Sequence, residues 1–291
     1  MVGKQERRYQ RMITVVLALI SLIMVIPLVL LVVASFTSNN EIVLHGYSFF
    51  PKELSLEAYR YIWNERAQVF HAYGITILVT AIGTTIGVMM TLLYAYVLAH
   101  EKFPGKTFLA FYLFFTMLFN GGLVPTYIMY TRYLHMKNTI PALIIPGLLM
   151  SAFNVILTRT YIQSNVPAAL SEAAKIDGAT EFQVFRKVVL PMCKPIIATV
   201  GLFAGLGYWN DWTNGLYYIT DTNKFSIQQL LNNMIKNIEF LSKNANSVGG
   251  GIPQETVRMA IAIVGLLPIL IVFPFVQKYF VKGISIGAVK G

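Results

Sequence analysis

The chain has 291 residues, of which 56% are hydrophobic and only 12% are charged, and its mean hydropathy is +0.60. Soluble domains carry about 25% Asp, Glu, Lys and Arg, so this composition excludes a soluble globular protein, and its hydrophobicity excludes a disordered one. The net charge of +10 comes from 23 Lys and Arg against 13 Asp and Glu. In a membrane protein we interpret such an excess as cations that hold loops on the inner side, and we expect no nucleic-acid partner.

Six stretches are long and apolar enough to cross a bilayer as helices, since a crossing needs about 20 largely apolar residues. They are residues 13–35, 73–99, 108–130, 140–161, 195–212 and 257–276. The first is longer than the apolar part of a secretory signal, so we expect it to remain as a span. The sequence therefore predicts an all-α integral membrane protein, surrounded by membrane lipid, in which residues 1–291 form a single transmembrane domain.

The distribution of Lys and Arg sets the orientation of these six spans. If both termini are cytoplasmic, the inner segments hold 14 of the 23 cations, including four within the first 11 residues. The positive-inside rule favours this arrangement. Two outer segments, 36–72 and 213–256, are longer than a turn. Within them, residues 56–63 and 227–238 show the apolar spacing of short helices.

The inner segment between the fourth and fifth spans, residues 164–194, contains signals for two short helices. Pro167 fits the first turn of one helix, and Gly178 fits its C-terminal cap in the left-handed conformation. Thr180 fits the N-cap of a second helix, which Pro191 is expected to end. The apolar side of that second helix consists of Val184, Phe185, Val188 and Val189. Two short helices joined at a glycine form a compact knob that suits a groove on a cytoplasmic partner.

The same segment resembles the EAA loop of bacterial ABC importer permeases. Glu172-Ala-Ala is followed after three residues by Gly178, and after nine more by Val188-x-Leu-Pro191, with Val in place of the usual Ile. The string 172–179 and the stretches 94–99, 208–211 and 274–283 are similar to the maltose-type carbohydrate uptake family, in particular to its smaller permease. The resemblance covers nearly the whole chain. A plain amphipathic hairpin at the membrane surface is the alternative.

The resemblance implies that the first short helix docks on an ATP-binding subunit. The residues that it assigns to this coupling are Glu172, Ala173, Ala174, Asp177, Gly178, Phe185, Leu190 and Pro191. It implies a second homologous permease, two ATP-binding subunits that hold ATP and Mg, and an extracytoplasmic solute-binding protein. Contact with that binding protein is expected from Asn244, Gly249, Gly250 and Gly251, although composition equally permits an idle loop.

Chemistry of its own is not expected of this chain. There is no Walker A loop, the four histidines are scattered, and no pair of carboxylates lies within a span. We therefore predict a non-enzymatic subunit with no metal or cofactor of its own. A membrane-embedded enzyme would need a catalytic pair, and a secondary carrier would usually need ionisable groups within its spans.

Polar groups at depth in the spans are candidates for a substrate pathway. They are Asn120, Asn154, Tyr208, Trp209, Asn210 and Asp211. Aromatic faces and amide or carboxylate groups suit sugars, although an interfacial aromatic belt would also explain the tryptophans. We therefore predict a permease subunit in the bacterial cell membrane that forms half of the pathway of an ATP-driven carbohydrate importer. Within the carbohydrates, we expect the substrate to be an oligosaccharide. A non-sugar solute remains the alternative substrate.

Overall fold

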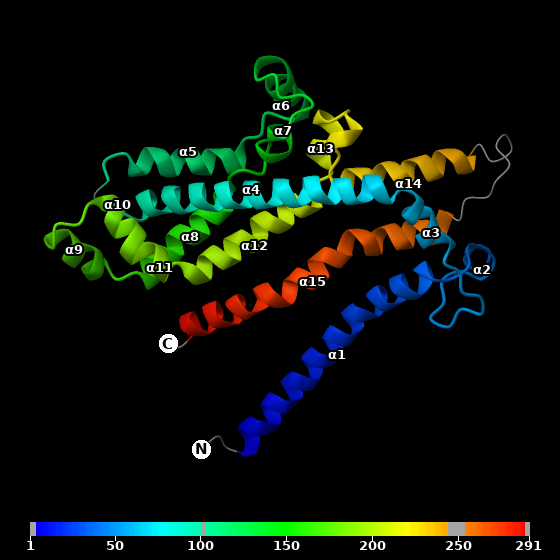
Figure 1. Ribbon diagram of the computed structural model, residues 1–291. Coiled ribbons are helices and arrows are strands. Elements are labelled where there is room, and N and C mark those ends of the chain that lie inside the picture. The colour runs from blue at the N-terminus through cyan, green and yellow to red at the C-terminus, as the bar shows by residue number, and fades with distance from the viewer. Residues whose placement is uncertain (1–3, 101–102, 244–253, 289–291) are drawn as a thin grey trace. The chain divides into compact units, whose positions relative to one another are not determined.

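The computed structural model describes residues 4–100, 103–243 and 254–288. In that part of the chain the regular secondary structure is helical, apart from one isolated antiparallel bridge between Thr37 and Leu54 (Figure 1). The chain divides into two compact units. One contains residues 1–69 and 231–268, and the other contains residues 70–230 and 269–291. The four residues predicted to contact a binding protein, Asn244, Gly249, Gly250 and Gly251, lie outside the described residues.

Three helices in the described ranges are long and apolar enough to cross a membrane. They are α1 (Lys4–Ser35), α4 (Arg66–Ala99) and α15 (Gln254–Ala288). They contain the first, second and sixth predicted spans. Two bent pairs of helices bring the number of candidate spans to at most five.

The third predicted span is one of these bent pairs. It consists of α5 (Lys106–Leu118), followed by α6 (Leu123–Ile128) and the π-helical turn η1 (Met129–Tyr133), with a bend of 114° at the break. The break, residues 119–122, includes Gly122, whose φ of +83° is in the left-handed region that glycine adopts without strain.

The fourth predicted span, residues 140–161, is not one continuous helix. It contains α7 (Pro141–Ile144), a non-helical segment over 145–151, and the first part of α8 (Ala152–Asn165). Pro146 has no N–H to continue α7, and Gly147 has a left-handed φ of +71°. A non-helical backbone is tolerated at membrane depth only where protein or a water-filled cavity surrounds it.

The unit formed by residues 1–69 and 231–268 contains two short helices, α2 (Asn39–His45) and α3 (Glu57–Asn64). The sequence predicts a helix over 56–63, and α3 confirms it. The predicted helix over 227–238 is also confirmed, because it lies within α14 (Ile227–Lys243). Arg258 of α15 joins α14 to α15, since its guanidinium contacts Glu239 at 3.2 Å and Glu255 at 3.3 Å.

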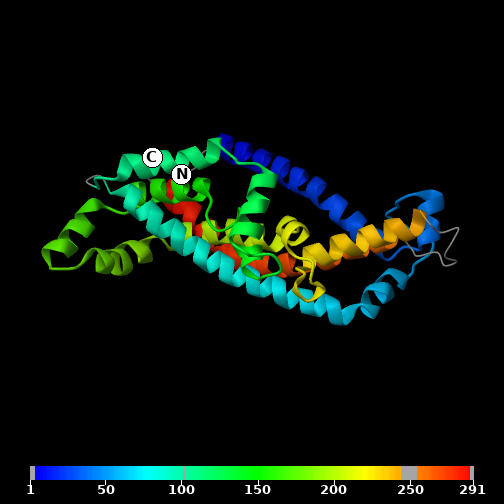
Figure 2. The ribbon, with the colours of Figure 1, turned by 90° about the horizontal axis from the view of Figure 1, so that it is seen from above.

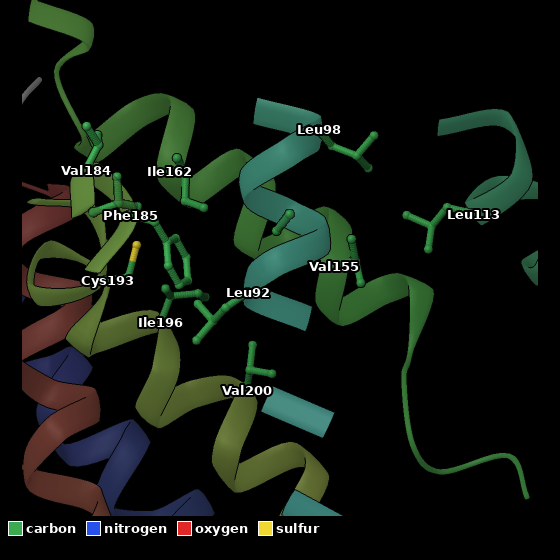
Figure 3. Close-up of a cluster of buried hydrophobic side chains, with 12 residues drawn as sticks. Leu92, Leu98, Leu113, Val155, Ile162, Val184, Phe185, Cys193, Ile196 and Val200 are labelled. Carbon is green, nitrogen blue, oxygen red and sulfur yellow. The ribbon is translucent and has the colours of Figure 1, made fainter. Parts of the chain in front are cut away.

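The unit formed by residues 70–230 and 269–291 is built around a core to which α4, α5, α8 and α12 (Lys194–Asn210) contribute side chains. Figure 3 shows Leu98 of α4 and Leu113 of α5 pointing toward each other, with Val155 of α8 nearby and Val200 on α12. Elsewhere along α4, a glycine permits close packing against α12. The ring of Tyr208 covers Gly83, where a Cβ would collide with it.

A second buried cluster in this unit holds the non-helical segment 145–151 in place. Tyr208 is buried and its hydroxyl donates a hydrogen bond of 2.9 Å to the carbonyl of Ile144. The amide of Asn214, in α13 (Thr213–Tyr218), donates one of 2.9 Å to the carbonyl of Pro146. A further short helix, η3 (Thr222–Lys224), follows α13. These bonds fix the segment through one carbonyl at the end of α7 and one just after it.

Candidate functional site

The segment that resembles an EAA loop begins with α9 (Ala168–Ile176), for which Pro167 is the N-cap. Its end has the geometry of a Schellman cap: the N–H of Ala179 bonds to the carbonyl of Ala174 at 2.9 Å, and that of Gly178 to Lys175 at 3.0 Å. Gly178 has a φ of +83°, and a Cβ there would meet no atom within 4 Å. The predicted left-handed glycine is confirmed, and it is needed for its backbone conformation rather than for space.

A second helical stretch follows after one turn. It consists of α10 (Glu181–Val184), the π-helical turn η2 (Phe185–Val189) and α11 (Leu190–Met192). Thr180 and Gln183 form a capping box at its start, with bonds of 3.3 and 2.8 Å, so the predicted cap is confirmed. The prediction that Pro191 ends this helix is wrong. The helix continues to Met192, because Pro191 falls in the first turn after the π-helical turn, where a missing N–H is tolerated. The chain then bends by 81° into α12.

We call residues 167–192 the elbow. It lies at the end of its unit where α4 also ends (Figures 1 and 2). Val184, Phe185 and Val189 are buried in the core that α4, α5, α8 and α12 also line. The ring of Phe185 lies 5.1 Å from that of Tyr96 on α4. The apolar side of the second helix therefore anchors the elbow to the helices behind it.

A polar cluster adds a second attachment between the elbow and α4. The carboxylate of Glu181 forms an ion pair with Lys175 of α9 and accepts a hydrogen bond of 2.9 Å from the hydroxyl of Tyr96. His100, just after α4, lies 3.8 Å from the same carboxylate. The hydrogen bond from Lys175, with smaller contributions from Tyr96 and the charges nearby, lowers the pKa of Glu181 below its ordinary value. We call Tyr96, His100, Lys175 and Glu181 the clamp.

The outward side of the elbow is formed by the predicted coupling residues of α9. Glu172, Ala173, Asp177 and Gly178 are exposed, whereas Ala174 is half-buried against the core. Two large apolar side chains accompany them: Ile176 is 86% exposed and Phe182 is 65% exposed. Among the residues predicted for the second helix, Pro191 is exposed, Leu190 is half-buried and Phe185 is buried. Phe185 thus supports the elbow from behind.

A cavity of about 360 Å³ lies elsewhere in the same unit, beside the middle of α12. Its walls come from α4, from the non-helical segment 145–151, from the start of α8 and from α12. The residues that line it include Gly87, Thr91, Ser151, Phe153, Asn154 and Phe203. A Cβ at Gly87 would lie 2.6 Å from the carbonyl oxygen of Leu149, so glycine is required for this close approach.

Of the six predicted pathway residues, only Asn154 lines this cavity. Asn120 is exposed at the α5–α6 break, where its side chain accepts the N–H of Gly122 at 2.8 Å. Asp211 accepts the N–H groups of Thr213 and Asn214 at the start of α13. The remaining three are placed as follows: Tyr208 packs on Gly83, Trp209 on Tyr73, and Asn210 bonds back to its own helix.

Sequence reasoning missed the clamp and Thr91. Tyr96 and His100 are four residues apart, so they lie on one face of a helix, and their rings meet edge to face at 4.5 Å. That spacing is a usable signal, but it does not show that Glu181 is the partner. Thr91 carries no signal at all, because a threonine in an apolar helix usually bonds its own backbone.

Comparison with known proteins identifies the family of the chain and its role in transport. Residues 83–286 match the family described as the binding-protein-dependent transport system inner membrane component. The chain belongs to this family. This binding-protein-dependent permease is 35% identical to the polygalacturonan/rhamnogalacturonan transport system permease protein YtcP of Bacillus subtilis (strain 168). The alignment covers 99% of the permease and 100% of YtcP. It is 27% identical to the arabinooligosaccharides transport system permease protein AraQ of Halalkalibacterium halodurans, with 96% of each chain covered.

The permease also resembles a solved structure over almost its full length. The crystal structure of a bacterial ABC transporter involved in the import of the acidic polysaccharide alginate contains a chain that is 28% identical, with a TM-score of 0.78, covering 96% of the permease and 99% of that chain. The predicted ABC importer permease of the bacterial cell membrane is therefore confirmed. A transport component of this kind belongs to an assembly with a binding protein and an ATPase.

Proposed function

We propose that this permease forms half of the translocation pathway of an ATP-driven importer for oligosaccharides. Relatives that match it over nearly their whole length are named for the transport of polygalacturonan, rhamnogalacturonan and arabinooligosaccharides, and a structural neighbour imports alginate. All of these substrates are carbohydrates, and the relatives include importers of acidic ones. These names support a carbohydrate over a non-sugar solute.

The elbow is the surface through which we propose that ATP hydrolysis drives the permease. The observation that carries the proposal is the exposed side of α9, where Glu172 and Ile176 lie uncovered beside the small Ala173. An exposed isoleucine and phenylalanine next to a carboxylate suit a cleft on a partner, and Ala173 permits close approach. The Schellman cap at the end of α9 and the capping box at Thr180 lie on either side of the joint between the two helices and make that joint rigid, so a push on α9 is transmitted to α4.

The wider assembly is proposed on the same basis. It contains a second homologous permease, two ATP-binding subunits that hold ATP and Mg, and an extracytoplasmic binding protein. We propose six spans with both termini cytoplasmic, which requires the broken α7–α8 segment to cross as one span. The excess of Lys and Arg on the inner side supports this orientation. In our proposal, this chain itself contributes no nucleotide site.

The test is coupling in the assembled importer, reconstituted in liposomes with the binding protein outside. Glu172→Lys reverses a charge on the exposed side of α9 and should abolish substrate-stimulated ATP hydrolysis and uptake while the permease still assembles in the membrane. Glu65→Lys changes another exposed glutamate, in the proposed outer segment; it is the matched control and should retain both activities. Normal stimulated hydrolysis with Glu172→Lys would contradict the proposed role of α9.

A further inference from the structure

The start of α8 carries backbone donors that nothing in the described part of the chain satisfies. The N–H groups of Ala152, Phe153 and Asn154 precede the first intrahelical bond, which Val155 makes to Ser151 at 3.1 Å. Ser151 is the N-cap, but its side chain accepts no hydrogen bond from the first turn. Unsatisfied backbone donors are costly within a membrane, so three together require an explanation.

Two buried polar side chains face the same cavity and also lack partners. Asn154 is 8% exposed and Thr91 is 2% exposed, and both line the cavity. Within the described residues, neither side chain makes a hydrogen bond. On α4, Thr76 and Thr85 bond back to their own helix, whereas the hydroxyls of Thr80 and Thr84 also lack partners. The Asn154 amide is on the first turn of α8, beside the free N–H groups. Donors from α4 and α8 therefore converge on one cavity.

The electrostatics of this cavity favour an anion. The positive end of the dipole of α8, a helix of 14 residues, is directed at it, and none of the residues that line it is charged. No carboxylate competes for the donors. Phe153 and Phe203 supply apolar surface at the same cavity, which suits the C–H face of a sugar ring. A volume of about 360 Å³ is at the small end of ligand pockets, which fits one sugar unit rather than a whole oligosaccharide.

We infer that this cavity binds the carboxylate of a uronic acid unit of the substrate. The carboxylate accepts hydrogen bonds from the first-turn N–H groups of α8 and from the side chains of Asn154 and Thr91, while the sugar ring packs on the phenylalanines. The inference rests on the proposed function, because it concerns how the same pathway handles a carbohydrate. It goes further in assigning the substrate class, an acidic oligosaccharide, and the residues that recognise its charge.

Binding to the importer without its external binding protein tests the inference directly, since that protein then no longer selects the sugar, and variants of this chain separate its cavity from the second permease. The probes are trigalacturonate and its fully methyl-esterified form, which is neutral. The wild-type importer should bind the acid at least about tenfold more tightly than the ester, as expected where a charge is recognised by oriented donors.

Asn154→Asp places a negative charge at the start of α8 with almost no change in shape, and it should remove the preference for the acid while binding of the ester stays within about twofold. Thr91→Val should weaken binding of the acid alone, by a few fold. The controls make the same changes outside the cavity: Asn165→Asp at the other end of α8, and Thr85→Val on an exposed part of α4.

Equal binding of acid and ester by the wild-type importer, no binding of either, or an equal loss of both in Asn154→Asp would overturn the inference. Any of these results leaves the proposed function intact if the full importer still takes up carbohydrate. If the full importer with its binding protein takes up no carbohydrate, the proposed function itself fails, and the inference fails with it.

Discussion

The hydroxyl of Tyr96 lies 2.9 Å from Oε2 of Glu181 and joins the last turn of α4 to the first turn of the second elbow helix. Through Glu181 the bond continues to Lys175 on α9, and the ring of Tyr96 packs on Phe185. One residue of α4 thus contacts both the polar and the apolar attachment of the elbow. Displacement of α9 by a partner would therefore be transmitted to α4 through residues that are already in contact.

Loss of the Tyr96 hydroxyl should weaken this transmission without unfolding the permease. Tyr96→Phe keeps the ring on Phe185 but removes a hydrogen bond to a charged group, which contributes about 1.5–3 kcal/mol at most. We expect more ATP to be hydrolysed for each sugar molecule imported, as measured in liposomes. Tyr112→Phe, on an exposed side of α5, is the control and should leave this ratio unchanged. An unchanged ratio in Tyr96→Phe would show that the clamp does not take part in coupling.

The clamp should also make the elbow sensitive to acid. The hydrogen bond from Lys175 lowers the pKa of Glu181 below its ordinary value of 4.5, so the fold favours the charged carboxylate. A group of this kind stabilises the fold fully above its ordinary pKa, and its contribution is lost as the pH falls through the lower, folded pKa. Hydrogen-exchange protection of the elbow amides, corrected for intrinsic rates, should therefore decrease in that acidic range. In Glu181→Gln this step should be missing; its persistence there would assign it to another group.

Gly178 should tolerate substitution according to backbone conformation rather than size. Its φ of +83° disfavours most side chains, although nothing lies within 4 Å of a Cβ. Gly178→Leu should cost about 1–2 kcal/mol and uncouple hydrolysis from uptake, because the left-handed conformation is strained in a residue with a Cβ. Gly178→Asn should remain coupled, since asparagine adopts this conformation more readily. ATP hydrolysis and uptake in both variants decide this, and equal defects would point to size instead.

Gly83 should behave in the opposite way, because there the limit is space. A methyl group would collide with the ring of Tyr208, which is held by its bond to Ile144. Gly83→Ala should lower the stability of the permease by about 1–3 kcal/mol, the usual cost of overpacking. Gly74→Ala, on the same helix with nothing within 4 Å, should be neutral or slightly stabilising. Thermal unfolding in detergent measures both, and equal melting temperatures would contradict the packing argument.

The elbow was predictable because its signals are local. A left-handed glycine, a threonine cap and an apolar side of the second helix act within a few residues of one another, and the structure has all three. The prediction that the second helix ends at Pro191 also relied on a local signal, and it was wrong. A proline stops a regular helix, but the π-helical turn before it shifts the bonding pattern, and such a turn leaves no reliable trace in the sequence.

By itself, the sequence determined the membrane class, the long apolar helices, the elbow motif and hence the family, because composition, periodicity and motif spacing are properties of the chain alone. Only the tertiary structure decided that Phe185 is buried, that Glu181 meets Tyr96, and that Asn154 faces a cavity together with Thr91 while the other five predicted pathway residues do not. The physical reason is that burial and the pairing of polar groups depend on residues brought together from distant parts of the chain. A polar residue in a span looks the same in the sequence whether its partner is its own helix, a neighbour or a substrate.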